Sequence, residues 1–205
     1  MDYQTRPPSS AEDVAAVSRQ VVAGSSLVRL SGIDWRVLEV TGHRTLLLAD
    51  RVIGTGPYHD VTWEADVTWE QCDLRQWLNG QFLDSLGQPL ASRVLRTKVV
   101  NRPNPAWRRP GGEDTEDQVF LLSMEEAADW LTGEHPRWTS FRWFKSDKLI
   151  ARYEDGSSAW WWLRSPGDET DRAALVSHVG NLRDYGGRVS ASGGVRPAFW
   201  LKLEP

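Results

Sequence analysis

Short apolar runs separated by polar, turn-rich segments make up most of the chain, and the pattern is clearest between residues 159 and 201. Three consecutive tryptophans, residues 160 to 162, open this stretch. A strand sends successive side chains to opposite faces, so they predict a strand that is apolar on both sides and lies in the middle of the domain. A closing strand follows at 195–201, in which Pro197 lacks an amide donor and is expected at a strand start, an edge or a bulge.

The same pattern indicates further strands and loops. Strands are predicted at 27–30, 34–40, 45–50 and 119–122, and a strand or a turn at 93–100. Residues 41–44 join two of these strands as a hairpin. Residues 51–67 and 101–117 show no sustained period and contain many glycines and prolines, which predicts long loops.

Three segments carry helical signals, namely a capping residue, apolar positions at helical spacing, or a terminating glycine. The first helix is capped by Ser10 and ended by Gly24. The second is capped by Thr68 or Asp73 and has an apolar face between residues 74 and 82. The third has a capping box at Ser123 and Glu126 and ends at Gly133.

Composition favours one domain with one substantial core. The chain has 205 residues, of which 40% are hydrophobic, and twelve are tryptophans. We assign residues 1–26 to a tail with a short helix and 27–205 to a single domain. The net charge of -4, with both signs well mixed, argues against a general binder of duplex nucleic acid. Arg164 and Arg196 interrupt apolar strands, so each is expected to be hydrogen-bonded to backbone carbonyls or carboxylates.

Cys72 is the only cysteine, so an intrachain disulfide and a multi-thiolate zinc site are both excluded. A helix dipole near Cys72 is able to lower the pKa of its thiol, but a small buried core cysteine is the favoured interpretation. There is no apolar run of signal-peptide or membrane-spanning length. We therefore expect a cytoplasmic protein without a membrane partner, although export through a partner or assembly into a particle leaves no trace in a sequence.

Catalytic motifs are scarce. The chain has no GxSxG elbow, phosphate loop, HExxH pair or dinucleotide glycine fingerprint, and its four histidines are far apart. An acidic loop with Asp168, Glu169 and Asp171 offers oxygen ligands, but its spacing matches no recognised calcium loop and is typical of solvated turn residues. We expect no cofactor, no metal and no enzymatic activity.

Basic and aromatic residues interleave between Pro136 and Lys148. Such a run can bind single-stranded nucleic acid or a sugar phosphate by stacking and charge. A half-buried segment with core rings and solvated charges is the alternative, and we favour it. A nucleic-acid accessory domain therefore stays open as a further hypothesis.

The motifs WWLRSPG (161–167) and GVRPAFWL (194–201), bridged by an AxxV…G segment at 174–180, resemble an uncharacterised bacterial domain family of the C-type-lectin-like superfamily, which also contains formylglycine-generating-enzyme-like domains. This resemblance implies an α+β C-type-lectin-like fold, with short antiparallel strands, two or three helices and long irregular loops. The oxidising relatives rely on a pair of active-site cysteines, from which a chain with Cys72 alone departs. The Glu-Pro-Asn-type and Trp-Asn-Asp motifs of calcium-dependent lectins are also missing.

The resemblance implies a recognition module for a protein or another macromolecular ligand. Some relatives are targets of diversity-generating retroelements, whose variable positions lie near the C-terminus. The expected binding residues are His178, Asn181, Arg183, Asp184 and Tyr185, with Asp168 and Glu169 beside them. Glycine punctuation between 177 and 192 predicts that these side chains project from turns onto one exposed face. An ordinary polar hairpin and a formylglycine-generating-enzyme-like enzyme with altered chemistry are the alternatives.

Overall fold

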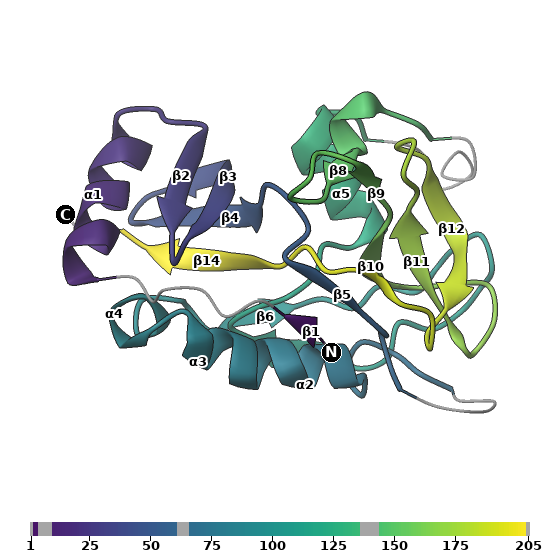
Figure 1. Cartoon of the computed structure of the whole chain (residues 1–205). Coiled ribbons are helices and arrows are strands. Elements are labelled where there is room, and N and C mark those ends of the chain that lie inside the picture. The colour runs from purple at the N-terminus through teal and green to yellow at the C-terminus, as the bar shows by residue number, and fades with distance from the viewer. Residues whose placement is uncertain (1, 4–9, 61–65, 136–143, 204–205) are drawn as a thin grey trace.

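The computed structural model describes residues 2–3, 10–60, 66–135 and 144–203. They form an α+β fold built mostly from antiparallel strands (Figure 1). The helical elements are α1 (Ala11–Val22), α2 (Asp73–Trp77), the π-helical η1 (Leu78–Phe82), α3 (Leu83–Ser85), α4 (Gln88–Ala91), α5 (Met124–Thr132) and the 3-10 turn η3 (Asp147–Leu149). The strands are β1 (Asp2–Tyr3), β2 (Leu27–Leu30), β3 (Ile33–Thr41), β4 (Arg44–Ala49), β5 (Gly54–Gly56), β6 (Thr97–Val99), β7 (Thr115–Asp117), β8 (Ala151–Arg152), β9 (Ser158–Ala159), β10 (Trp161–Pro166), β11 (Arg172–Val176), β12 (Leu182–Arg188), β13 (Gly193–Gly194) and β14 (Ala198–Lys202).

The strand β14 completes a four-stranded sheet in the order β14-β4-β3-β2. The three strands predicted near the N-terminus are confirmed, and β14 adds to their outer edge with Phe199 opposite Leu47. The Phe199 ring packs on Trp35, with 4.6 Å between the ring centroids. Pro197 directly precedes β14, as predicted for a residue without an amide donor.

The tryptophan-rich strand β10 lies inside the second sheet, whose order is β1-β5-β13-β10-β11-β12. Trp161 and Trp162 are completely buried, which confirms the prediction of a strand that is apolar on both faces. Each indole nitrogen donates to a backbone carbonyl, that of Leu149 and that of Gly56 respectively. Each buried indole N–H group therefore has a hydrogen-bond acceptor.

Arg196 is buried beside this strand, between β13 and β14. Its Nε donates to the carbonyl oxygen of Ala49 at 2.7 Å, and its guanidinium lies 5.0 Å from the centroid of the Trp161 ring. Burial lowers the pKa of Arg196 to about 9. The prediction of a hydrogen-bonded, structural arginine is confirmed at this position.

The helices begin mostly where the capping signals lie. Ser10 caps α1 through a reciprocal capping box with Asp13, and Ser123 caps α5 through one with Glu126. The helix at 73–85 differs from the prediction, because its cap is Cys72 and not Thr68 or Asp73. The Cys72 sulfur accepts a hydrogen bond from the amide of Arg75 at 3.4 Å. Sulfur here performs the role usually given to a hydroxyl or carboxylate oxygen.

Residues 119–122 do not form the predicted strand. Only Phe120 makes a ladder contact, an isolated bridge to Ala198. The carbonyl of Val119 accepts instead from the side chain of Asn79, in η1, and the carbonyl of Leu121 accepts from the side chain of Arg164. Side-chain donors thus replace the ladder at these two carbonyls, while Leu122 accepts from the backbone amide of Arg164. The predicted strand or turn at 93–100 contains β6.

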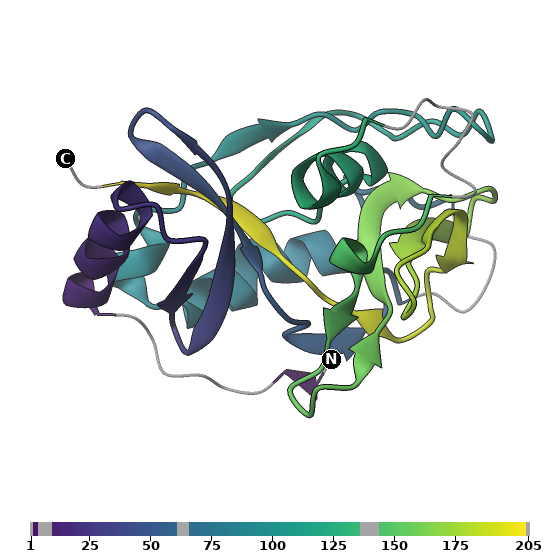
Figure 2. The same ribbon diagram turned by 90° about the horizontal axis from the view of Figure 1, so that it is seen from above.

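Helices α2 to α4 run along one side of both sheets (Figure 1). Helix α1 packs on β2 and on α4. Seen from above, α5 and β6 lie on the same side of β14 (Figure 2). Helix α5 contacts β10 of one sheet and β3 of the other, so it lies where the two sheets meet.

Candidate functional site

The residues expected to bind a ligand are spread over the β11–β12 hairpin. His178 is exposed in the turn between the two strands. Asn181, Arg183 and Tyr185 follow at alternate positions and are half-buried. The Arg183 guanidinium lies 5.4 Å from the centroid of the Tyr185 ring and donates to its hydroxyl. Arg183 and Tyr185 share one face of β12, and Asn181, directly before the strand, continues the same alternation.

Asp184 contradicts the prediction of a common exposed face. Its exposed fraction is 2%, and its neighbours Leu182 and Gly186 are also buried. The sequence pattern predicted turns here, whereas most of the polar residues of this segment lie in the seven-residue strand β12. An intervening residue in a strand points to the opposite face, so Asp184 packs inward.

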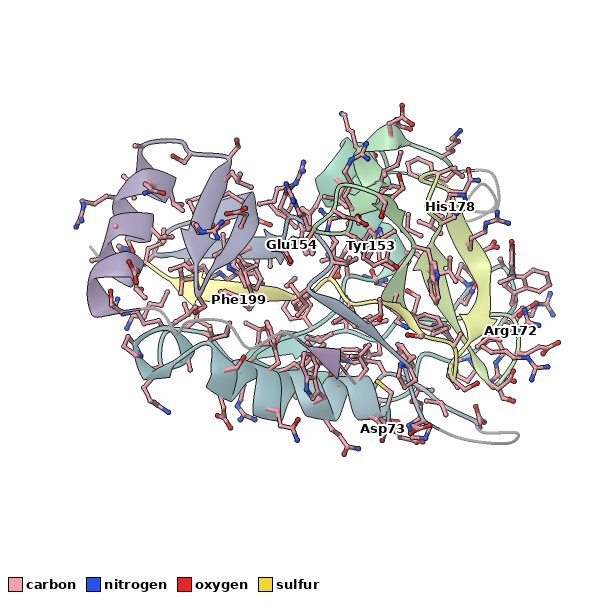
Figure 3. All side chains as sticks on the ribbon, in the orientation of Figure 1. Asp73, Tyr153, Glu154, Arg172, His178 and Phe199 are labelled. Carbon is pink, nitrogen blue, oxygen red and sulfur yellow. The ribbon has the colours of Figure 1, made fainter. Side chains whose placement is uncertain are left out.

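Asp168 and Glu169 lie at the other end of the hairpin from His178. Their carboxylates are 3.6 Å and 3.5 Å from Nε of Arg172. Figure 3 shows Arg172 and His178 at opposite ends of β11 and β12. The predicted residues therefore form no single cluster. Within the described part of the chain, no group of three or more His, Cys, Asp or Glu side chains is arranged to hold a metal ion.

Most of the basic and aromatic run, residues 136–143, lies outside the described residues. Of its remainder, Phe144 is half-buried, and Lys145 and Lys148 are exposed.

A cleft of about 510 Å³ lies between α5, β6, β10 and β14, away from the hairpin. We call it the α5 cleft. Its walls combine charged side chains from α5, from β10 and from the segment after β6 with three aromatic rings. Its volume lies within the range of small-molecule sites in proteins.

The floor of the α5 cleft is a buried ion pair. Arg164, with a side chain only 3% exposed, donates from Nη2 to Oε1 of Glu126 at 2.7 Å and from Nη1 to the other carboxylate oxygen. It also donates to the carbonyls of Leu121 at 2.8 Å and Val100 at 3.2 Å. The prediction that Arg164 is bound to carbonyls or carboxylates is confirmed. Such a bidentate pair holds both side chains in fixed positions.

One wall is the exposed side of α5. Glu125 is partly buried there, and burial raises the pKa of its carboxyl group. Its counter-charge is the side chain of Arg102, at 3.4 Å. One turn further along α5, Asp129 lies 2.6 Å from Nδ1 of His135.

The aromatic part of the cleft comes from three elements. Trp130 lies on α5, Trp200 on β14, and Phe120 on the segment that precedes α5, and the two tryptophans are half-buried. The Arg44 guanidinium lies 4.4 Å from the centroid of the Trp200 ring. Rings with one open face supply apolar contact area at low cost in conformational entropy.

Cys72 lies apart from the α5 cleft and is fully buried. Burial raises the pKa of its thiol to about 12. The hydrogen bond from the amide of Arg75, at the start of the helix, lowers the pKa, but this effect is smaller. The favoured interpretation of Cys72 as a small buried core cysteine is therefore confirmed. The thiol donates to the carbonyl of Trp69 at 3.4 Å and belongs to the core.

Sequence reasoning missed the α5 cleft. Ser123 and Glu126 were identified as a helix cap, which is correct, but Glu126 also binds Arg164. A charged residue inside an apolar strand needs a partner, and that requirement was the signal available at Arg164.

The comparisons with known proteins give a family and no activity. Residues 42–203 match the family model of DUF6273, a domain of unknown function. No curated protein and no solved structure matches the chain. In the described residues, no helix has the length and apolar character needed to cross a membrane. Because the family model covers most of the chain, this protein belongs to the DUF6273 family.

Proposed function

We propose that this protein is a non-enzymatic recognition module that holds a ligand, a protein segment or another macromolecule, in the α5 cleft. One observation carries the proposal, namely that the Arg164–Glu126 pair is held in place while aromatic rings and charged side chains of both signs line the rest of the cleft. Preorganised side chains lose little entropy on contact, so a rigid floor favours binding.

The polar groups of the cleft are engaged in structural contacts. The Ser123 hydroxyl accepts from the amide of Glu126 as a helix cap, and Asp129 contacts an exposed histidine. Cys72, the one thiol, is buried elsewhere. Binding is therefore favoured over a formylglycine-generating-enzyme-like activity with altered chemistry.

We further propose a C-type-lectin-like fold and an intracellular, cytoplasmic site of action. Short antiparallel strands, separated by long irregular connections such as 100–114, support this fold assignment. The matching family has no known function, so neither proposal draws on the activity of a relative.

Binding in the cleft is tested by titrating the isotope-labelled protein with peptide and small-molecule mixtures and following amide chemical shifts. We expect shifts clustered on α5, β6 and β14. The variant Trp130→Ala should remove them, while Trp107→Ala, an exposed tryptophan outside the cleft, should retain them. Shifts confined to the β11–β12 hairpin would refute the assignment to the cleft.

A second candidate is a retroelement-diversified surface on β12. The observation that favours it is the common face of Asn181, Arg183 and Tyr185. A reverse transcriptase gene and a near-copy of the C-terminal coding segment beside the gene would support it. Uniform conservation of these three codons among close relatives would refute it.

A further inference from the structure

Strand β6 has a pairing partner on one edge only. It forms a two-stranded ladder with β7, and no other strand of the described chain joins this ladder. The outer side of such a strand presents unpaired amide and carbonyl groups, which are a template for pairing with another chain. What this open edge of β6 faces is therefore a question about binding.

The lining of the α5 cleft indicates that the open edge of β6 faces it. Four consecutive residues, 97 to 100, line the cleft, whereas no residue of β7 does. Side chains on one face of a strand come from alternate residues, so an unbroken run is typical of a strand that presents its edge.

The peptide unit between Val100 and Asn101 gives the same direction. Its amide donates to the carboxylate of Asp114, directly before β7, at 3.0 Å. Its carbonyl accepts from Nη2 of Arg164 at 3.2 Å. The two groups of a trans peptide point in opposite directions, so Arg164 and the cleft lie on the side of β6 away from β7.

Three main-chain groups stay open on this edge. Every second residue of a strand directs both its amide and its carbonyl to the same side. Because the carbonyl of Val100 points to the cleft, so do its amide and both groups of Lys98. Among the described residues, no hydrogen bond joins these three groups to another part of the chain. Lys98 and Val100 are both exposed, so a ligand is able to reach them.

The edge also lacks the protection that a lysine side chain usually gives. The Lys98 ammonium is held by Asp114, on the β7 side, at 2.9 Å. The cleft contains the rings of Trp130 and Trp200, which offer apolar contacts to the side chains of an added strand.

Charge does not select the ligand of this cleft. Its lining balances basic against acidic side chains, namely Lys98, Arg102 and Arg164 against Glu125, Glu126 and Asp129. A ligand held by main-chain hydrogen bonds needs no charge of its own, and the open edge of β6 supplies such bonds.

We propose that the α5 cleft binds an extended segment of a partner protein, which adds as a strand to the open edge of β6. This inference rests on the proposed function and specifies its ligand. Strand addition draws its affinity from main-chain hydrogen bonds and its specificity from contacts with alternate side chains. The segment is therefore recognised by its extended backbone first and by its apolar side chains second.

The test follows the amide chemical shifts of the isotope-labelled full chain during titration with a capped hexapeptide of alternating threonine and valine. We expect shifts at β6 and α5. Methylation of every peptide nitrogen removes the donors on both edges of the peptide and should abolish these shifts. Methylation of alternate nitrogens leaves one edge intact and should keep the affinity within about twofold, which controls for the added methyl groups.

Two proline variants locate the contact on the chain. Lys98→Pro removes an amide donor from the open edge and should weaken binding about tenfold, as expected for one lost hydrogen bond. Glu116 lies opposite Lys98 in β7 with its amide directed away from β6, so Glu116→Pro is the matched control and should leave the affinity unchanged. Lys98→Gln removes the charge but keeps the amide, and should also bind normally. Circular dichroism checks the fold of each variant, and the methylated peptides decide alone if Lys98→Pro does not fold.

The other outcomes overturn the inference in distinguishable ways. Equal binding of the unmodified and fully methylated peptides, with shifts in the cleft, would refute strand addition and keep the recognition module. Unchanged affinity in a folded Lys98→Pro, or shifts confined to the outer strands β2 and β12, would refute β6 as the accepting edge. No shift with the hexapeptide, when the mixtures above do produce shifts in the cleft, would refute strand addition alone. No shift from either set would refute the module as well.

Discussion

Arg164 and Glu126 connect the central strand β10 to the first turn of α5 through a bidentate ion pair, in which the arginine is almost fully buried. The same carboxylate completes the capping box of the helix. One side chain therefore fixes both the start of α5 and its position on the sheet.

Removal of the arginine charge should destabilise the protein strongly. Arg164→Met keeps most of the side-chain volume but leaves Glu126 without its counter-charge, and breaking a buried pair in this way costs about 3 to 5 kcal/mol. Urea denaturation measures the change. Arg102→Met, at the exposed pair with Glu125, is the control and should cost less than about 1 kcal/mol. Similar losses in both variants would contradict a structural role specific to Arg164.

Gly193 is required for a steric reason. A Cβ atom at this position would overlap the rings of Trp160 and Trp162, so Gly193→Ala should cost about 1 to 3 kcal/mol as overpacking does. At Gly80, in the helical segment η1, an added Cβ atom would meet no other atom within 4 Å, so Gly80→Ala should stabilise the protein by about 0.5 to 1 kcal/mol. Thermal unfolding compares the two variants. A neutral Gly193→Ala would show that the rings move aside.

The buried thiol makes stability depend on alkaline pH. The folded pKa of Cys72 is about 12, raised by burial from an ordinary value of 9.0, so its contribution is complete below about pH 9 and is lost as the pH rises toward 12. Tyr58, also buried, has a pKa raised well above 10.0 and acts in the same direction. Urea midpoints should therefore fall between about pH 8 and about pH 11. In Cys72→Ser the fall should be smaller, and an identical fall would assign it to other groups.

Glu125→Gln should leave the stability of the protein nearly unchanged. Burial raises the pKa of the Glu125 carboxyl group, so the folded state favours its neutral form, and this favourable contribution is lost as the pH rises through the raised pKa. Near pH 7 the neutral glutamine should leave stability unchanged or slightly higher, within about 0.5 kcal/mol. Urea denaturation at this pH measures the change. A clearly destabilised variant would mean that the Arg102 contact outweighs the cost of burial.

Local patterns predicted most of the elements, and long-range contacts account for most of the errors. The tryptophan run, the Ser10 cap and the Ser123 capping box depend on residues close in sequence, and all are confirmed. The α5 cleft joins α5, β6, β10 and β14, whose proximity no local period reveals. Asp184 shows a different limit, because Gly186 and Gly187 suggested a turn where the structure has a bulged strand.

The pairing of β14 with β4 also constrains the order of folding. Leu47 faces Phe199, so the edge of β4 lacks this ladder partner until all of the intervening chain has been synthesised. Contacts of such long sequence separation slow folding and leave strand edges open to other chains during synthesis. We therefore expect fragments that end before residue 198 to leave this edge of β4 exposed and to aggregate more readily than the complete chain.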